Sequence, residues 1–355
     1  MSVLVLSNAS PDRHVPGGIG GLCGELARLG DDVRLVVATA AGVELAPDGV
    51  EVLAADEAPP VIPRDPRHAV ERALANATRL YAAAVRSLRS RPAHVVIADG
   101  WEVTYAACSL RTSHDLPILA RLDTPAPGTG PIAEHRTDLV MQIVWWLTCE
   151  AREVVVPTTL HRDWLVGGLR VPAAKVTVVP PGVDVAVCTA ARPADPRAVL
   201  IAACDPQASS AVRSLRRRSI RVTLADPGVA QVGEAAIVAV LDPSRTDVAL
   251  AGMAAGCAVL VPDSGPLRGL VHAGRGALPV HDGSELVATV AGLVDDERRL
   301  RRLQRSAARQ AARRHAWSVV APRYTDLLAR AIAHEADLRP GLPPIGRTVP
   351  GGIRT

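Results

Sequence analysis

A glycine-rich loop near the start of the chain is the first segment whose residue types could hold a ligand. Gly17-Gly18-Ile19-Gly20-Gly21 stands between the apolar run Val3–Leu6 and residues with helical spacing. Glycines let a backbone approach a ligand closely, and a helix that starts there offers free N–H groups to a phosphate. The loop has neither the G-x-G-x-x-G fingerprint of dinucleotide sites nor a P-loop G-K-[ST]. It predicts an anion-binding turn, with a tight turn of no functional role as the alternative.

Two aspartates follow apolar runs that are typical of strands. Asp99 follows Val95–Ala98, and Asp123 follows Pro117–Leu122. In open α/β sheets, ligands bind at the carboxyl ends of the strands. We therefore predict that both carboxylates lie at a binding site, although an aspartate in this position can equally cap a helix or close a turn.

Positive charge comes almost entirely from arginine, since Lys175 is the only lysine. Arg213 and Arg216–Arg218 form one cluster, for which a solvated face and a diphosphate site are the two alternatives. The stretch Arg298–Arg314 predicts the solvated face of an amphipathic helix. Residues His161–Asp163 predict an exposed helix start.

The composition excludes several classes of protein. Aromatic residues make up 2% of the 355 residues and Phe is absent, which argues against a nucleic-acid binder that stacks bases on aromatic rings. The six cysteines show no C-x-x-C spacing, so no metal site is predicted. Scattered thiols without an export signal favour a reducing compartment, and we expect a cytoplasmic protein. No run of about 20 apolar residues exists, so no integral membrane segment is expected.

Helical and strand patterns alternate along the chain. The N-terminal strand, glycine loop, helix and next strand form a βαβ unit, and the alternation continues to Val176–Val179. This pattern predicts a parallel sheet with helices on both faces. The proline-rich segment Arg192–Pro196 interrupts it before a second α/β series begins. We predict an N-terminal domain over residues 1–185, a C-terminal domain over residues 198–335 and a flexible tail over residues 336–355.

Several segments, taken in order, resemble the family 4 retaining glycosyltransferases of the GT-B fold. The glycine loop looks like the opening loop of that family, and Val95–Trp101 is similar to its V-V-H-A-H-D-W. Ala151–Asp184 resembles the stretch from E-x-x-A-x-x-V-I-x-S to V-I-P-N-G-V-D. Gly252–Gly265 resembles A-M-A-x-G-x-P-V-V-A-x-x-x-G-G, and His315–Trp317 resembles the closing F-S-W. The resemblance covers residues 3–333.

This resemblance implies an α/β protein of GT-B fold, in which two Rossmann-like domains face each other across a cleft. The segment between Pro206 and Asp242 is shorter than a full donor half needs, so we expect a shortened C-terminal domain. Enzymes of the family transfer a sugar from a nucleotide sugar to an acceptor, with retention of configuration and without a required metal or other cofactor. Asp99 and Asp123 would be the catalytic residues, near the acceptor and the reacting centre. The donor-binding residues implied are Gly17, Gly18, Gly20, Arg213, Asp242, Ser264 and Gly265.

Two donor-site motifs of the family are missing. The glutamates of its E-x7-E fall on Pro243 and Ala251, and its G-R-x-x-x-x-K-G falls on Ala203–Ser210, which has neither Arg nor Lys. Loss of both cations removes charge-assisted hydrogen bonds worth roughly 1.5–3 kcal/mol each. The alternative is a catalytically inactive GT-B-like protein that acts as a protein partner or activator of another enzyme, or as a sugar-nucleotide sensor. An epimerase of the same fold is a third hypothesis, for which no carboxylate and histidine set is evident.

Overall fold

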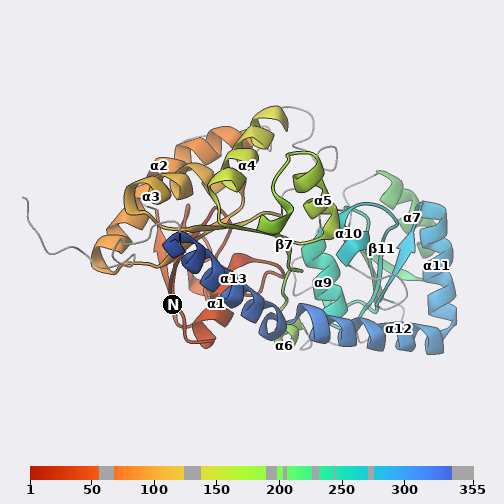
Figure 1. Cartoon of the computed structure of the whole chain (residues 1–355). Helices are drawn as coiled ribbons and strands as arrows, with labels where there is room; N and C mark the ends of the chain where they lie inside the picture. The colour runs from red at the N-terminus through yellow and green to blue at the C-terminus, as the bar shows by residue number, and fades with distance from the viewer. Residues whose placement is uncertain are drawn as a thin grey trace, which may run out of the picture.

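The computed structural model describes residues 1–55, 68–123, 137–188, 198–202, 206–225, 232–243, 245–270 and 276–337. These residues form two α/β units, each built on a parallel sheet with helices on both faces (Figure 1). The predicted linker Arg192–Pro196 lies outside the described residues.

The first sheet has seven strands in the order β3-β2-β1-β4-β5-β6-β7. All of its strand pairs are parallel. The strands are β1 (Ser2–Ser7), β2 (Asp32–Val37), β3 (Val50–Ala54), β4 (Val95–Asp99), β5 (Ile118–Arg121), β6 (Glu153–Val156) and β7 (Val176–Val178). Every residue of β1 is buried, as expected for an apolar run that is covered on both faces.

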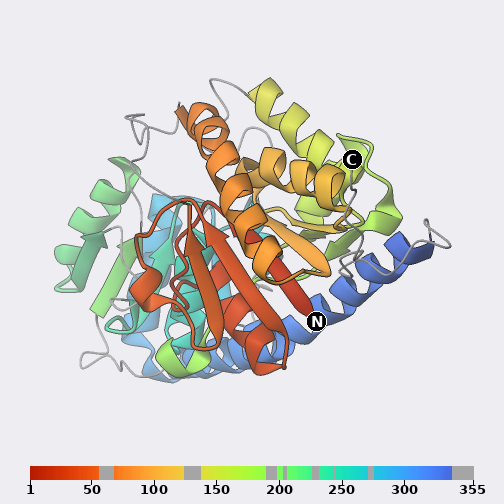
Figure 2. The same cartoon turned by 90° about the vertical axis from the view of Figure 1, so that its left-hand side faces the viewer.

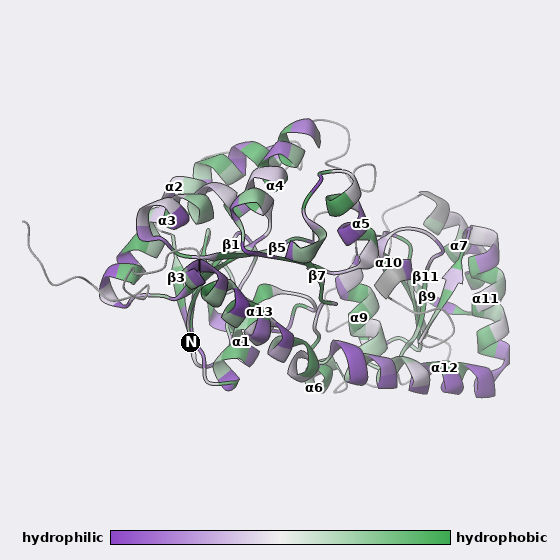
Figure 3. Cartoon of the chain, in the orientation of Figure 1, coloured by the Kyte–Doolittle hydropathy of each residue, from purple (hydrophilic) through white to green (hydrophobic). Residues whose placement is uncertain are grey.

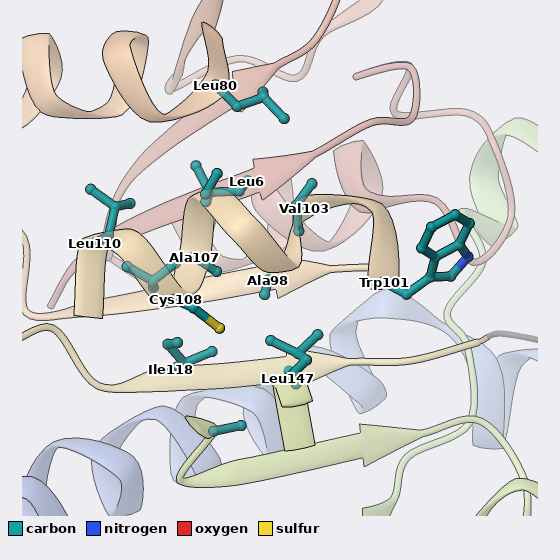
Figure 4. Packing of buried hydrophobic residues seen from close by; sticks show 14 of the residues in the cluster. Leu6, Leu80, Ala98, Trp101, Val103, Ala107, Cys108, Leu110, Ile118 and Leu147 are labelled. Atoms are coloured by element: carbon teal, nitrogen blue, oxygen red, sulfur yellow. The ribbon is translucent and has the colours of Figure 1, made fainter. Parts of the chain in front are cut away.

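Helices cover both faces of this sheet. One face packs against α2 (Ala69–Ser90), α3 (Thr104–His114), α4 (Thr137–Glu150) and α5 (Thr159–Gly167). Figure 4 shows this core, in which Leu6 and Ala98 of the sheet lie near Leu110 of α3 and Leu147 of α4. The other face packs against α1 (Ile19–Arg28) and α13 (Trp317–Asp337). Short helical turns, η1 (Val43–Leu45), η3 (Trp101–Val103) and η5 (Ala173–Lys175), complete the unit.

The second sheet has five strands in the order β12-β11-β10-β8-β9. Its strands are β8 (Ala198–Ala202), β9 (Arg221–Ala225), β10 (Ile237–Val240), β11 (Ala258–Pro262) and β12 (Ala277–Val280). Its helices are α6 (Val185–Cys188), α7 (Pro206–Arg216), α9 (Thr246–Ala254), α10 (Pro266–Leu270), α11 (Gly283–Asp295) and α12 (Glu297–Gln310). The short strand β12 is not predicted from the sequence, because it has only four residues and Pro279 weakens its strand pattern.

The arginine-rich stretch Arg298–Arg314 forms α12 and the π-helical turn η6 (Ala311–His315). Leu300 and Leu303 pack into the second unit, while the arginines of α12 lie on its outer side. Figure 3 shows that outer side as hydrophilic, which confirms the predicted amphipathic helix. Among the described residues, no helix is long and apolar enough to cross a membrane.

The last helix returns to the first unit. Helix α13 packs its buried residues Tyr324, Leu327 and Leu328 on the first sheet, and Figure 2 shows it running along that unit. Near its end, the Glu335 carboxylate accepts hydrogen bonds from Arg111 at 3.1 Å and Arg152 at 2.6 Å. The predicted C-terminal domain of residues 198–335 therefore includes a helix that covers the first sheet. Of the predicted flexible tail, residues 336–355, the first two residues end α13, and the rest lies outside the described residues.

Two connections between the units lie side by side. The backbone N–H of Val183 donates to the carbonyl of His315 at 2.6 Å, and that of Trp317 donates to the carbonyl of Val183 at 3.3 Å. The ring of Trp317 fills the space above Gly182, where a Cβ would meet the indole at 2.2 Å. The chain thus leaves the first unit and re-enters it at one place.

Candidate functional site

Both sheets direct the carboxyl ends of their strands toward one cavity. The strand order reverses between β1 and β4 in the first sheet and between β8 and β10 in the second. Such switch points are where ligands bind in open α/β sheets. A cavity of about 440 Å³ lies there. Its polar lining residues are Asp99, Glu102, Arg121, Asp123, His161 and Tyr324 on one side and Thr246 and Asp247 on the other.

The glycine loop forms one edge of this cavity. Gly17 has a φ of +73°, and its N–H donates to the carbonyl of Gly182 at 2.6 Å. Gly18, the N-cap of α1, and Ile19, the first residue of the helix, line the cavity, so the start of α1 lies at its edge. A Cβ on Gly20 would lie 2.1 Å from the carbonyl oxygen of Pro11. Gly17 and Gly18 therefore line the cavity, whereas Gly20 permits close packing behind it.

Asp99 and Arg121 form a buried ion pair in the cavity wall. Arg121 donates to Oδ1 of Asp99 and to the carbonyl of Gly17, and Ser7 Oγ donates to Oδ2 of Asp99 at 2.7 Å. Burial raises the pKa of Asp99, although Arg121 opposes the shift. Burial also disfavours the charge of Arg121, but Asp99 and Tyr324 outweigh this and raise the pKa of the guanidinium. The pair connects β4 and β5 to the glycine loop. The hydrogen bonds of the Arg121 guanidinium are therefore made within the protein.

Glu102 lies in the same wall and is not among the residues singled out from the sequence. Its pKa is raised to about 7, first by burial and then by the nearby carboxylates of Asp123 and Asp99. The signal that could have found it is the spacing Trp101-Glu102-Val103, in which one carboxylate stands between two apolar residues directly after a strand.

His161 also lines the cavity, which corrects the expectation of an exposed helix start at His161–Asp163. The ring is 4% exposed, and its Nδ1 lies 2.7 Å from Oγ1 of Thr158, the N-cap of α5. Burial lowers the pKa of His161, with Asp123 opposing the shift. The physical reason is that α5 starts at the carboxyl end of β6, so one side of its first turn faces the site. Arg162 and Asp163 are more exposed than His161.

The second unit contributes the N-terminal turn of α9. Thr246 and Asp247 line the cavity, and the side chain of Arg245 bonds to Asp247 at 3.0 Å. Asp242 follows β10 and adjoins the lining residue Pro243. Ser264 and Gly265 follow β11 and adjoin the lining residue Pro266. Asp242, Ser264 and Gly265 are not themselves among the described lining residues.

Arg213 lies away from the cavity. It is exposed in the last turn of α7, a helix that starts beyond the carboxyl end of β8 and runs back along the sheet. A residue at the end of such a helix lies toward the opposite edge of the sheet. The structure thus brings Gly17, Gly18, Asp99 and Asp123 together, and leaves Arg213 outside the group.

The described lining is rich in carboxylates and poor in free cations. Asp99, Glu102, Asp123 and Asp247 face one guanidinium, Arg121, which is already bonded. No group of His, Cys, Asp and Glu in the described ranges is arranged to hold a metal ion. The groups available to an anion here are the backbone N–H groups at the starts of α1 and α9.

Two parallel-sheet units that share a site at their carboxyl edges define the GT-B fold, and comparisons with solved structures agree. Sucrose-phosphate synthase from Thermosynechococcus elongatus has a TM-score of 0.72 at 16% identity, with 94% of this chain and 100% of that chain covered. The Anabaena protein Alr3699/HepE, in complex with UDP and glucose, has a TM-score of 0.66 at 14% identity, with 93% and 99% covered. A glycosyltransferase from Rickettsia africae has a TM-score of 0.61 at 10% identity, with 93% and 98% covered. At such identities the likeness establishes the fold.

A comparison of sequences points the same way for the first unit. The model of Glycosyltransferase Family 4 matches residues 19–187, from the first residue of α1 to α6. Comparison with curated proteins gives no significant match.

Proposed function

We propose that this protein is a glycosyltransferase that transfers a sugar from a nucleotide sugar to an acceptor with retention of configuration. The observation that carries the proposal is the cavity at the switch points of both sheets, with the N-terminal turns of α1 and α9 at its edges. Similarity to Glycosyltransferase Family 4 supports it, as does similarity to HepE, whose crystal structure in complex with UDP-glucose is known. Retention rests on the family resemblance alone.

The helix N-termini suit the leaving group of such a reaction. When the bond between the sugar and the diphosphate breaks, negative charge grows on the diphosphate oxygens. Backbone N–H groups at a helix start, aided by the helix dipole, stabilise this charge without a free lysine or arginine. Gly18 fits at the start of α1 where a larger residue would not, because a Cβ there would lie 2.8 Å from the carbonyl oxygen of Val15. This arrangement offers a role for the backbone where the family's Arg and Lys are missing.

The part of the cavity wall that the second unit contributes lacks the two glutamates of the family. It must therefore bind the sugar and ribose of the donor through other residues. Ala251, at one of the two family glutamate positions, is 1% exposed in the core of the second unit. Pro243, at the other, lines the cavity as an apolar surface. Thr246 and Asp247 are the polar lining groups nearby, and we assign them to the hydroxyl groups of the donor. Both carboxylate oxygens of Asp247 also accept hydrogen bonds from Arg245, which hold the side chain in place.

Calorimetric titration of the protein with UDP-, GDP-, ADP- and dTDP-glucose tests the proposal. We expect one of them to bind, and we expect Thr246→Trp, which fills the cavity beside α9, to abolish that binding. Gly167→Trp is the matched control, because Gly167 is exposed, lies outside the cavity lining and has open space around its Cβ position. Absence of binding by all four compounds would overturn the proposal. Binding without transfer or hydrolysis of the sugar would favour a sensor.

A further inference from the structure

The segment that forms α12, η6 and the start of α13 carries an uninterrupted series of positive charges. Residues 298–325 include nine arginines and no aspartate or glutamate. Acidic residues flank the segment, at Asp295–Glu297 and at Asp326, but none lies within it. Since the whole chain has a net charge of +4, all other residues together carry −5. The net positive charge of the chain is therefore due to this one segment.

The helix directs these arginines away from the body of the protein. Leu300, Leu303 and Ala307, at intervals of three and four residues, are buried in the second unit. The eight arginines of α12 and η6 are all exposed, and we call them the arginine ridge: Arg298, Arg299, Arg301, Arg302, Arg305, Arg309, Arg313 and Arg314. Figure 1 shows α12 along the lower edge of the second unit, and Figure 3 shows its outer side as hydrophilic.

Most of the charge on the arginine ridge is not neutralised by the described residues. Arg301 pairs with Glu297 at the start of α12. Nε of Arg305 and Nε of Arg309 each donate to a backbone carbonyl one turn earlier, at 3.2 Å. In the described part of the chain, five guanidinium groups have no hydrogen-bond or ion-pair partner: those of Arg298, Arg299, Arg302, Arg313 and Arg314. Most of the ridge is therefore free to bind an anionic partner.

The shape and composition of the ridge indicate the kind of partner. From Arg298 to Arg314 the ridge is roughly 24 Å long, and none of its arginines lines the cavity. Residues 298–316 contain no aromatic residue. Protein partners are usually held by aromatic anchors in pockets, and single-stranded nucleic acids by grooves with aromatic rings. A lipid surface needs neither, because a row of guanidinium groups on an outer helix can contact anionic headgroups along its whole length.

We propose that the arginine ridge binds the surface of a membrane that contains anionic phospholipids. Guanidinium groups form paired hydrogen bonds with phosphate oxygens, which suits them to lipid headgroups. The contact is peripheral, because Leu300 and Leu303 stay in the core of the second unit and do not enter the bilayer. The negative charge on the rest of the chain favours the orientation in which the ridge faces the lipid. This inference goes beyond the proposed function and does not depend on it.

Sedimentation of the full chain with lipid vesicles tests this surface. We expect the protein to sediment with phosphatidylglycerol vesicles at low salt and to stay in solution with phosphatidylcholine vesicles. Binding should weaken as salt is added, because salt screens exposed charges. The triple variant Arg298→Gln, Arg302→Gln and Arg309→Gln should lower the partition coefficient by roughly 10²-fold, at about fivefold for each arginine.

Two further triple variants are the controls. Arg89→Gln, Arg217→Gln and Arg218→Gln together remove the same charge from exposed positions outside the ridge, and should lower the partition coefficient by less than about threefold. Lysine in place of the same three ridge arginines keeps the charge, and should keep most of the binding. Glutamine and lysine are both good helix formers, so α12 should stay folded in each variant, which urea denaturation checks.

The remaining outcomes would overturn the inference. Equal sedimentation with the two lipids, or an equal loss of binding in the two glutamine variants, would show that the arginine ridge does not bind anionic lipid. Tighter binding to duplex DNA or to a polyglutamate peptide than to phosphatidylglycerol vesicles, at the same salt, would make the partner a nucleic acid or an acidic protein. If no nucleotide sugar binds in the calorimetric titration, the proposed function fails, while the vesicle experiment still decides this inference.

Discussion

The two walls of the cavity are built differently. The wall from the first unit contains the Asp99–Arg121 ion pair, the half-buried Glu102 and the buried His161. Hydrogen bonds join the ion pair to Ser7 of β1, and His161 to the N-cap of α5. The wall from the second unit offers two prolines, Thr246 and Asp247 from its described residues. The first wall thus holds more charged and hydrogen-bonded side chains than the second. Charged side chains predominate in the first wall, whereas the described part of the second has two prolines, a threonine and one aspartate.

Removal of the buried ion pair should be the strongest test of this contrast. Arg121→Ala leaves Asp99 buried without its partner and releases the carbonyl of Gly17. We expect a loss of about 3–5 kcal/mol in the free energy of unfolding at pH 8, measured by urea denaturation. The exposed Arg302→Ala should change it by less than about 0.5 kcal/mol. A loss below about 1 kcal/mol for Arg121→Ala would show that the first wall is not held by this pair.

The raised pKa of Glu102 predicts a pH-dependent cost in the free energy of unfolding. The folded state binds this proton more tightly than the unfolded state, in which the pKa is near 4.5. Stability contributed by the protonated form is therefore lost as the pH rises from about 4.5 to about 7. Relative to the wild type, Glu102→Gln should gain about 3 kcal/mol between pH 4.5 and pH 8. Denaturation at both pH values checks this, and an unchanged difference would refute it.

The backbone conformation of the glycine loop gives a smaller effect. Gly17 has a φ of +73°, and a Cβ there would lie 3.1 Å from Cβ of Pro181. Gly17→Ala should therefore cost about 1–2 kcal/mol of stability, and it should weaken donor binding because the loop can no longer hold the start of α1. Gly167→Ala, in open space, is the control for denaturation and titration. Equal stability of the two variants would contradict the assigned strain.

Arg213 should contribute least. Because it is exposed in the last turn of α7, Arg213→Ala should change stability by less than about 0.5 kcal/mol and leave donor affinity within about twofold. Titration of this variant beside Thr246→Trp compares the far side of the second unit with its cavity side. A large loss of affinity for Arg213→Ala would show that the second wall includes a cation from this helix.

The sequence predicts most of the architecture because each element has a strong local pattern. Apolar runs mark β1 and β4, and alternation of strands and helices predicts two parallel sheets. Glycines and aspartates that follow strands lie at the carboxyl edge of a parallel sheet, which is why Gly17, Gly18, Asp99 and Asp123 meet at the cavity.

The remaining site residues depend on contacts between distant segments. His161 looks like a surface residue in sequence, and only the packing of α5 beside β6 buries it. Glu102 acquires its raised pKa partly from Asp123, which belongs to another strand connection. Arg213 lies near a donor-side segment in sequence, but its helix carries it away from the cavity. Local patterns do not place His161 or Arg213, and the spacing Trp101-Glu102-Val103 indicates only that a carboxylate follows a strand.

The return of α13 to the first sheet has a consequence for how this chain can be divided. In topological terms, the second unit is an insertion between β7 and α13, and both of its ends meet where Val183 pairs with Ala316. Deletion of α13 would uncover one face of the first sheet and leave Arg111 and Arg152 without Glu335. Exchange of the whole insert at this paired junction would keep the first unit complete. Engineered chimeras with a new second wall should therefore be joined at residues 183 and 316 rather than at a single linker.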